Sequence, residues 1–493
     1  MFSVTVWIFI VVAVLAYYAL KPKKRGIKLP GPWGLPLVGN AFQIGKRMHI
    51  TLAKWGTKYG PMCKVKLGPI EVVLVSDHQM AKEMLALDAF IGRTTPAEFT
   101  LYEGETVGII NSEGEIWEQQ RRFVVRQLRD FGFGKTSMES IIMEEVNELG
   151  DRLASLKGEP VSNMKGFLSL ATVNSLWSIV AGKRYSQDDP KLRALAHQLS
   201  GAFNEAGENA GAFFIMKWLK HILPDLSGYN AIRKMFAELA EFVGNTIQEH
   251  KNTFQEDSPR DFIDVYLNEI KSTTDPSSSF HGVAAEKQLI GVVADLFQAG
   301  ADAMASTLNW AILHLISNPE ILRKLQVEIK EVTGNSRPVS FSDRPKMPYS
   351  LAMVNELLRQ TLAPFGVPHS VLSDTEYKGV FFPKGTVVMI NLHFIHHDPK
   401  LWGDPENFRP ERFLSPDEKS LVKVEYLNPF MVGRRQCPGE SVARDTIFLF
   451  LVNLVQRFDL LRDPSSPELD TEPEIGFVLQ PKPFKVIFQE RKL

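Results

Sequence analysis

The sequence predicts a mainly α-helical fold with smaller β-sheets, an α+β architecture, and two observations lead to it. Residues 62–77, MCKVKLGPIEVVLVSD, and residues 379–391, GVFFPKGTVVMIN, alternate and are rich in valine and isoleucine, as expected for strands. Between them, apolar residues repeat mostly with a helical period. A chain of 493 residues is long enough for about three domains, but one large domain over residues 40–493 is predicted, because no repeat or linker divides it.

The composition is that of a chain with a large buried core, since 44% of the residues are apolar and 23% are charged. The net charge is −1, which provides no broad basic field, so no nucleic-acid partner is predicted. Only two cysteines are present, Cys63 and Cys437, which excludes a disulfide framework and fits a reducing compartment.

The N-terminus predicts a membrane anchor over residues 1–20. This stretch has no charged side chain, and as a helix it would be roughly 30 Å long, about the thickness of a bilayer core. A cleaved signal peptide is the alternative, but the apolar run is too long and lacks a basic start. The basic cluster KPKKRGIK that follows places the rest of the chain in the cytosol. The basic and proline-rich residues 21–39 predict a stiff hinge between anchor and domain.

A second long apolar stretch, residues 286–317, predicts a helix in the core rather than a second membrane span. Five polar side chains interrupt it, and polar groups are costly in hydrocarbon: Asp295, Gln298, Asp302, Asn309 and His314. In its middle, residues 299–301 carry only small side chains, which leaves room for a bulky flat group against the helix. Tight packing by another helix is the alternative.

The loop PFMVGRRQCPGES, residues 429–441, surrounds Cys437 with features that predict an anionic sulfur. Gly433 and Gly439 permit a tight loop that directs amide N–H groups at the sulfur. Arg434, Arg435 and the start of a helix after Gly439 should each lower the thiol pKa. No Cys/His pair at zinc spacing lies nearby, which leaves a nucleophile or a single metal ligand, with a buried structural cysteine as the alternative.

A family resemblance rests on this loop. Five of its residues match the signature F-x-x-G-x-R-x-C-x-G: Phe430, Gly433, Arg435, Cys437 and Gly439. The chain therefore resembles the cytochrome P450s, which are haem-thiolate monooxygenases. Three further stretches follow the family's order, WEQQR at 117–121, ELLR at 356–359 and FRPERF at 408–413, so the resemblance covers nearly the whole chain. The anchor and hinge resemble the microsomal branch.

The resemblance implies haem b as the cofactor and residues 40–493 as a haem-thiolate catalytic domain. Cys437 would be the axial ligand of the haem iron, a metal-ligating role. The resemblance also implies three propionate partners, Trp117, Arg121 and Arg435, with His369 as the remaining propionate contact. Phe430, Gly439 and Ala299 are the other cofactor-binding residues it implies. Without the cysteine motif, Trp117 would be taken as ordinary core and Arg121 as part of a solvated face.

Two further groups of residues are predicted to be structural. Glu356 and Arg359 are three residues apart, so they share one helix face and can pair. By resemblance, Arg412 is the third member of this buried triad. The histidines in HFIHHDP, residues 393–399, lack a convincing spacing for metal ligands, so an ordinary loop is expected there.

The sequence departs from the family in the middle of the long core helix. The family motif A/G-G-x-D/E-T-T contains a threonine that helps deliver protons, but here the stretch is AGADAM. Asp302 matches the motif's acid, and Ala303 stands at the threonine position, so these are the two catalytic positions. An alanine side chain cannot donate a proton. Ser306 shares the helix face of Asp302, but it is not expected to face the oxygen site.

This departure leaves three functions open. The resemblance favours a monooxygenase that inserts one oxygen atom from O2 into a lipophilic substrate such as a lipid, steroid, terpenoid or xenobiotic. The alternatives are a haem-thiolate isomerase or dehydratase that acts on a peroxide, and a non-enzymatic haem sensor or carrier. Labelled oxygen and dependence on a reductase would separate them.

The implied partners follow from the monooxygenase function. Electrons would come from NADPH through NADPH–cytochrome P450 reductase, with cytochrome b5 as a further partner, at the endoplasmic reticulum membrane. The candidate docking cations are Arg126, Arg129, Lys135, Lys423, Arg434 and Arg444. The substrate pocket would draw on the loop before Trp117, residues 202–218, the helix at Ala299 and Ala303, Val367 and Phe477. These segments are mostly apolar, which favours a lipophilic substrate.

Overall fold

The computed structural model describes residues 27–35, 38–45, 47–94, 97–130, 136–186, 189, 219–361, 365–465, 469–474 and 478–492. Within them the chain is mainly helical with small sheets, which confirms the predicted fold class. Several predicted features lie outside the described residues: the anchor 1–20, part of the hinge, the pocket segment 202–218, Lys135 and Phe477.

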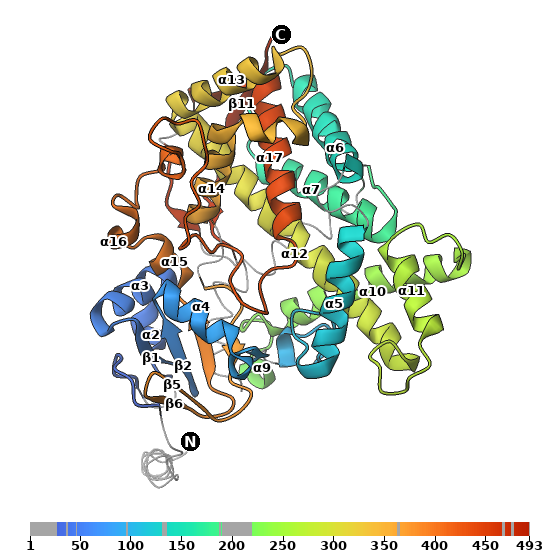
Figure 1. Cartoon of the computed structure of the whole chain (residues 1–493), viewed down its shortest axis with the longest axis vertical. Helices are drawn as coiled ribbons and strands as arrows, with labels where there is room; N and C mark the ends of the chain where they lie inside the picture. The colour runs from blue at the N-terminus through green and yellow to red at the C-terminus, as the bar shows by residue number, and fades with distance from the viewer. Residues whose placement is uncertain are drawn as a thin grey trace, which may run out of the picture.

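Both stretches that were predicted as strands contribute to one five-stranded sheet at the N-terminal end of the molecule (Figure 1). β1 (Met62–Leu67) and β2 (Ile70–Val75) form an antiparallel hairpin, and β2 pairs in parallel with β7 (Val387–Ile390). β4 (His369–Ser370) and β3 (Gly92–Arg93) complete the order β1-β2-β7-β4-β3. The β3–β4 register places Arg93 opposite His369.

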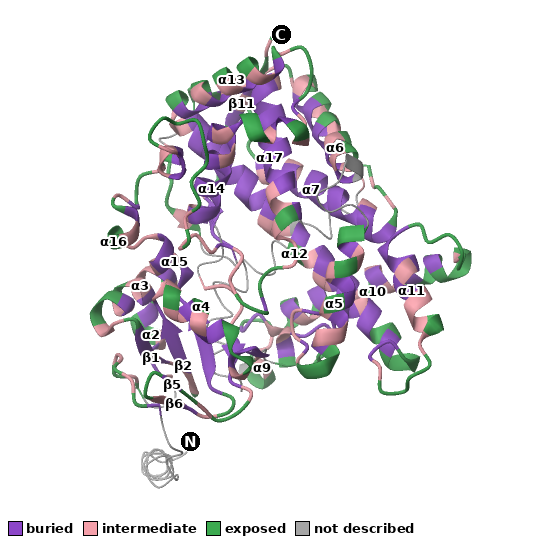
Figure 2. Cartoon of the chain, viewed as in Figure 1, coloured by how far each residue is buried: buried purple, intermediate pink, exposed green. Residues whose placement is uncertain are grey.

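The helical part is built around α12 (Gly282–Ser317), which packs against α7 (Met164–Ala181), α10 (Tyr229–Thr253), α14 (Pro348–Thr361) and α17 (Glu440–Arg457). Among the described helices, α12 alone is long and apolar enough to cross a membrane by length and composition. About two thirds of its most apolar window, 65%, is buried inside the protein (Figure 2). The prediction of a core helix is therefore confirmed.

The small residues in the middle of α12 serve the two purposes that the sequence left open. Gly300 faces α7, where an added Cβ would lie 2.5 Å from a methyl carbon of Leu176, so one side of the helix is packed tightly. Ala299, by contrast, is exposed, and Ala303 is half-buried, although Phe297 and Met304 are buried. One side of α12 thus packs closely against a helix, and the other side faces an open space.

The remaining elements complete the fold. The other described helices are α2 (Ala41–Ile44), α3 (Met48–Tyr59), α4 (His78–Ala86), α5 (Gly114–Asp130), α6 (Thr136–Ser155), α9 (Leu219–Ile222), α11 (Phe262–Ser272), α13 (Pro319–Thr333), α15 (Leu392–His396) and α16 (Pro399–Trp402). The short 3-10 helices are η1 (Asp88–Phe90), η2 (Ala97–Phe99), η3 (Phe341–Lys346) and η4 (Pro410–Phe413). Three two-stranded sheets pair β5 (Thr375–Tyr377) with β6 (Val380–Phe382), β8 (Phe458–Arg462) with β11 (Val486–Glu490), and β9 (Pro473–Glu474) with β10 (Gln480–Pro481).

The predicted ion-pair triad joins α14 to η4 in the core. Arg359 donates from Nε and Nη2 to the two carboxylate oxygens of Glu356, at 2.7 and 2.8 Å. The Nε atom of Arg412 donates to the same carboxylate at 3.1 Å. The three side chains are almost completely buried. The backbone carbonyl of His396 accepts a further hydrogen bond from Arg359. This pairing confirms the predicted triad.

The histidines at 393–397 form a packed cluster rather than a metal site. His397 donates from Nδ1 to the carbonyl oxygen of His393, and Nε2 of His396 accepts from the backbone N–H of Asn428. Burial lowers the pKa of His396 to about 3 and that of His397 to about 4. Within the described residues, the one group with metal-like spacing lies elsewhere, at His250. Its two ring nitrogens are already bonded to Thr246 and Asp261.

The triad generates a prediction about stability. Glu356→Gln removes the charge that neutralises two buried guanidinium groups, so we expect the free energy of unfolding to fall by about 3–5 kcal/mol. Lys324→Met is the matched control, because it breaks the half-buried ion pair of Lys324 with Glu411 on η4 and should cost only about 1 kcal/mol. Denaturant unfolding of both variants tests this, and equal losses would contradict it.

His314 generates a prediction about acid stability. This imidazole stacks on Phe408 with ring centroids 3.9 Å apart, its Nε2 is buried without a partner among the described residues, and burial lowers its pKa to about 3. The unfolded imidazole titrates near 6.5, so the unfolded state binds more protons below that pH, and stability falls as the pH drops toward 3. One such histidine should lower the free energy of unfolding by about 1.4 kcal/mol at about pH 5.5.

His314→Phe should therefore make the acid-induced loss of stability shallower by this amount. The stacking is kept and an unpaired buried nitrogen is removed, so stability at about pH 7.5 should be equal or higher. Denaturant unfolding at the two pH values measures both effects. An unchanged pH dependence would show that the imidazole is already protonated in the folded protein.

Candidate functional site

The loop that carries Cys437 is closed by its own backbone. The Cys437 N–H donates to the carbonyl oxygen of Phe430 at 3.0 Å, and the Gln436 N–H donates to that of Gly433 at 3.1 Å. Gly433 has a φ of +79°, and an added Cβ would lie 2.2 Å from the carbonyl oxygen of Leu85, so only glycine fits. α17 begins directly after Gly439, as predicted.

The thiol of Cys437 is exposed, yet it is desolvated by the surrounding protein, which raises its pKa. Both observations hold if the sulfur lies deep between protein walls and faces an open space. A backbone N–H of Gly439 and the charge of Arg121 lower the pKa, and Glu440 raises it further. The predicted lowering of this pKa is therefore wrong for the protein alone.

The reason is that the two arginines of the loop, Arg434 and Arg435, interact with other groups rather than with the sulfur. Arg434 forms ion pairs with Asp88 and Glu118. Arg435 donates to backbone carbonyl groups, and its guanidinium lies 3.9 Å from the centre of the Trp117 ring. Neither arginine is left to stabilise a thiolate.

These properties decide between the roles that the sequence left open for Cys437. A raised pKa argues against a free nucleophile, because only the thiolate attacks. Exposure argues against a buried structural cysteine, such as Cys63, which has no exposed surface and a pKa raised to about 11. A single metal ligand agrees with both properties, since a bound metal ion deprotonates a coordinating thiol by its own charge.

Next to this loop, three arginines gather. Arg435 donates from Nε to the carbonyl oxygen of Ile91 at 2.9 Å and from Nη2 to that of Ser112 at 2.7 Å. The guanidinium of Arg93 also donates to carbonyl groups, at 3.1 and 3.2 Å, while its backbone N–H donates to the Glu113 carboxylate. Arg121 donates to the carbonyl oxygen of Gln436, beside the cysteine. The described hydrogen bonds of these guanidinium groups thus go to neutral carbonyl oxygens.

Desolvation and mutual repulsion lower the pKa values of this arginine cluster. The pKa of Arg435 falls to about 9 and that of Arg93 to about 10, and the pKa of Arg121 is also lowered. The Glu113 carboxylate is the one acid that counteracts the shifts of Arg93 and Arg435. Positive charge therefore exceeds negative charge among these residues, which fits an anionic ligand.

Trp117 lies against the same cluster with an unused donor. Its Nε1 is buried and has no hydrogen-bond partner among the described residues. A buried N–H without a partner costs about 1–3 kcal/mol, so it marks a place where an acceptor is missing. The indole ring carries the guanidinium of Arg435 on its face, and Arg121 lies 5.8 Å from its centre.

His369 joins the arginine cluster from strand β4. Its Nδ1 lies 2.9 Å from the carbonyl oxygen of Phe90, which only accepts, so Nδ1 carries the proton of the neutral ring. Burial, with the charges of Arg93 and Arg435, lowers the His369 pKa to about 3. Arg93 itself was missed in the sequence, because no motif contains it. Only its strand pairing with His369 brings it to the site.

The polar side chains in the middle of α12, Asp302 and Ser306, bond to residues outside that helix. Asp302 forms an ion pair with Nζ of Lys165 at 2.6 Å and accepts from Nε2 of Gln480 at 3.2 Å. The Ser306 hydroxyl is buried and bonded to Gln480 and to the carbonyl oxygen of Leu479. The methyl group of Ala303 provides no donor or acceptor.

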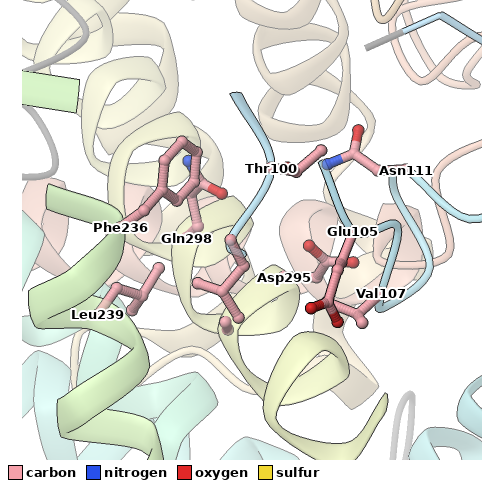
Figure 3. Close-up of a pocket in the computed structure, with 10 residues that line it drawn as sticks. Thr100, Glu105, Val107, Asn111, Phe236, Leu239, Asp295 and Gln298 are labelled. Carbon is pink, nitrogen blue, oxygen red and sulfur yellow. The ribbon is translucent and has the colours of Figure 1, made fainter. Parts of the chain in front are cut away.

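A small cavity borders α12 one turn before Ala299 (Figure 3). Its volume is about 10 Å³, room for about one water molecule, and ten residues line it: Thr100, Leu101, Glu105, Val107, Asn111, Phe236, Leu239, Ala294, Asp295 and Gln298. Asp295 accepts from the backbone N–H groups of Ile109 and Ile110 at 2.6 and 2.9 Å, and burial raises its pKa to about 7. This carboxyl group therefore fastens the loop before Trp117 to the core helix.

Comparison with known proteins agrees with this geometry. The cytochrome P450 family model matches residues 29–488. The farnesoate epoxidase of Bombyx mori is 33% identical over 488 residues, covering 97% of each chain. Cytochrome P450 2J5 of Mus musculus is 35% identical over 466 residues, 93% of this chain and 90% of the relative. Cytochrome P450 2J2 of Homo sapiens is 34% identical over 476 residues, 95% of this chain and 92% of the relative.

The family binds haem b, and the residues of this chain fit that group. Cys437 is exposed, positive charge exceeds negative charge in the arginine cluster, and Trp117 Nε1 has no acceptor among the described residues. A thiol ligand and two propionates match these three features. The chain belongs to the cytochrome P450 family and is a haem-thiolate monooxygenase.

Proposed function

We propose that this protein inserts one atom of molecular oxygen into a lipophilic substrate, by hydroxylation or epoxidation, with electrons from NADPH delivered by NADPH–cytochrome P450 reductase. The observation that carries the proposal is the exposed Cys437 beside three arginines, Arg435 buried and Arg93 and Arg121 half-buried, whose guanidinium groups bond to neutral carbonyl oxygens. A thiolate-ligated haem supplies the oxygen chemistry, because the thiolate favours cleavage of the O–O bond.

The chain's own residues would hold the haem by charge and by hydrogen bonds. Cys437 would provide the axial sulfur, and Phe430 and Gly439 would keep the loop closed around it. Arg93, Arg121 and Arg435 would neutralise the two propionates, and charge-assisted bonds of guanidinium to carboxylate are strong. Trp117 Nε1 would donate to one of them, as the absence of another acceptor supports. His369 would lie at the same edge, and Ala299 would leave room for the flat ring.

The substrate would lie on the open side of α12. Ala299 and Ala303 have small side chains, so the helix leaves room for a substrate there. Val367 lies in the segment before β4. Asp295 holds the loop that closes this side, which keeps water out and positions an apolar guest. The name of the silkworm relative, farnesoate epoxidase, supports a terpenoid among the lipophilic substrate classes.

Asp302 would take part in proton delivery for oxygen activation, since its carboxylate is half-buried and solvent reaches its ion pair with Lys165. One observation favours a second function. Ala303 has no hydroxyl, and the nearby Ser306 hydroxyl is bonded elsewhere, so proton delivery has fewer groups than in the family motif. A haem-thiolate isomerase or dehydratase acting on a peroxide would need neither those groups nor a reductase.

The reductase-binding face we propose is narrower than the sequence predicted. Three of the candidate cations already have acidic partners: Arg434 with Asp88 and Glu118, Arg444 with Glu440, and Arg126 with Glu269. Arg129 and Lys423 are exposed and form no ion pair with a described residue. These two cations are therefore the ones we propose for docking of the reductase, and cytochrome b5 would compete for the same face.

We propose that residues 1–20 anchor the protein in the endoplasmic reticulum membrane, with the catalytic domain in the cytosol. Two large apolar side chains near this end support the proposal, because Trp33 is 73% exposed and Phe42 is 80% exposed. Large apolar side chains exposed close to a proposed anchor can lie against the membrane surface.

Trp117→Phe tests the proposed haem site, because its expected effect on stability differs in sign between the haem-free and the haem-loaded protein. Without haem, the variant should be equally or more stable, because it loses a buried N–H that has no partner. With haem, it should lose about 1–3 kcal/mol, because a charge-assisted hydrogen bond is removed. Thermal unfolding of the apo and haem-loaded forms measures both. A loss of the same size in the two states would show that Trp117 is ordinary core.

Turnover with NADPH, reductase and labelled O2 tests the proposed reaction on a panel of lipophilic substrates. We expect one labelled atom in the product and no product from Cys437→Ala. Ala303→Thr should lower the share of electrons lost as hydrogen peroxide about twofold or more, because it adds a donor to the proton path. Rapid hydroperoxide rearrangement without electron uptake would instead favour the isomerase.

A further inference from the structure

A buried glutamine, Gln480, lies between Asp302 and Ser306, the two polar side chains in the middle of α12. Gln480 is 4% exposed, and both ends of its amide are used. Its Nε2 donates to Oδ2 of Asp302 at 3.2 Å, and its Oε1 accepts from the Ser306 hydroxyl at 2.7 Å. A single amide therefore bridges an acid and an alcohol one helical turn apart.

The spacing of the residues on α12 shows why the hydrogen bonds of Gln480 matter for the position of Asp302. Ala299, Asp302, Ala303 and Ser306 are positions i, i+3, i+4 and i+7, so they share one face of the helix. Because Ala303 has no polar group, the polar atoms of this face are those of Asp302 and Ser306, and Gln480 bonds both. The position of the acid thus depends on a residue from outside the helix.

The Gln480 side chain comes from a strand that is hydrogen-bonded to α12. Gln480 begins β10, and the preceding carbonyl, that of Leu479, accepts from Nε1 of Trp310 at 2.9 Å and from Ser306 at 3.2 Å. These bonds fix the strand against α12. A fixed backbone leaves the Gln480 side chain little freedom, so the amide can orient the Asp302 carboxylate.

Asp302 has its second anchor on the opposite side. Nζ of Lys165, from α7, lies 2.6 Å from Oδ1, and each side chain of this pair is 20% exposed. Solvent therefore reaches the pair, and a proton can enter there. One carboxylate oxygen is held at the entry side, and the other is held by Gln480.

We propose that Gln480 is a positioning residue, which holds Asp302 in the orientation that delivers protons and keeps the Ser306 hydroxyl turned away from Ala303. This inference rests on the proposed monooxygenase function. It assigns a role in oxygen activation to the C-terminal hairpin β9–β10, which no sequence motif marked.

The test replaces Gln480 with methionine, which has a similar length and no amide. Trp310→Phe is the matched control, because it removes another hydrogen bond between α12 and the same strand without touching Asp302. With reductase and NADPH, Gln480→Met should lower kcat about tenfold, with the electrons recovered as hydrogen peroxide and KM changed by less than about twofold. Trp310→Phe should keep most of the wild-type coupling, because the Ser306 hydroxyl still donates to the Leu479 carbonyl and the Gln480 amide is unchanged. Equal losses in both variants would overturn the inference.

A double-mutant cycle on thermal unfolding provides a readout that does not require turnover. The shift of the melting temperature for Gln480→Met combined with Asp302→Ala should be smaller than the sum of the two single shifts, because the same contact is removed twice. Trp310→Phe and Asp302→Ala should be additive. If the wild type shows no turnover, the proposed monooxygenase function fails, and the cycle alone decides whether Gln480 holds Asp302. An additive Gln480 cycle overturns the inference even where turnover is coupled.

Discussion

An excess of positive charge on partly buried arginines is the constraint on which the site depends. Arg93, Arg121 and Arg435 donate to neutral carbonyl groups, and desolvation lowers the pKa of each. A protein without a ligand there would gain stability by losing these charges, since uncompensated buried cations are costly. The arrangement fits an anionic ligand, and the family binds haem b, for which we propose these residues as the propionate partners.

The rest of the fold serves to bring these cations to one place. Arg93 comes from β3, Arg121 from α5, His369 from β4 and Arg435 from the loop before α17. The five-stranded sheet places Arg93 opposite His369, and carbonyl oxygens of residues 91–112 hold Arg435. On the other side, α12 supplies a wall with small side chains, packed by Gly300 against α7 and open at Ala299.

The proposed proton delivery depends both on the acid that α12 carries, Asp302, and on the hydroxyl that it lacks at Ala303. Without a hydroxyl at Ala303, Asp302 is the one acid of the segment, and Lys165 and Gln480 hold its two oxygens. The carboxyl group of Asp295, two turns earlier, instead fastens the loop that closes the pocket. Two acids on one helix thus have separate duties, which follow from their partners: backbone amides for Asp295, and a cation with an amide for Asp302.

The sequence by itself determined the fold class, the family, the cysteine loop, the core helix and the pairing of Glu356 with Arg359, because each depends on local spacing or on a contiguous motif. The tertiary structure alone decided the pKa of Cys437, since Arg434 and Arg435 find partners remote in the chain. It also decided the positions of Arg93 and Gln480, which stand in no motif. Their positions depend on strand pairing and on packing between distant segments, and neither has a periodic signal that a sequence displays.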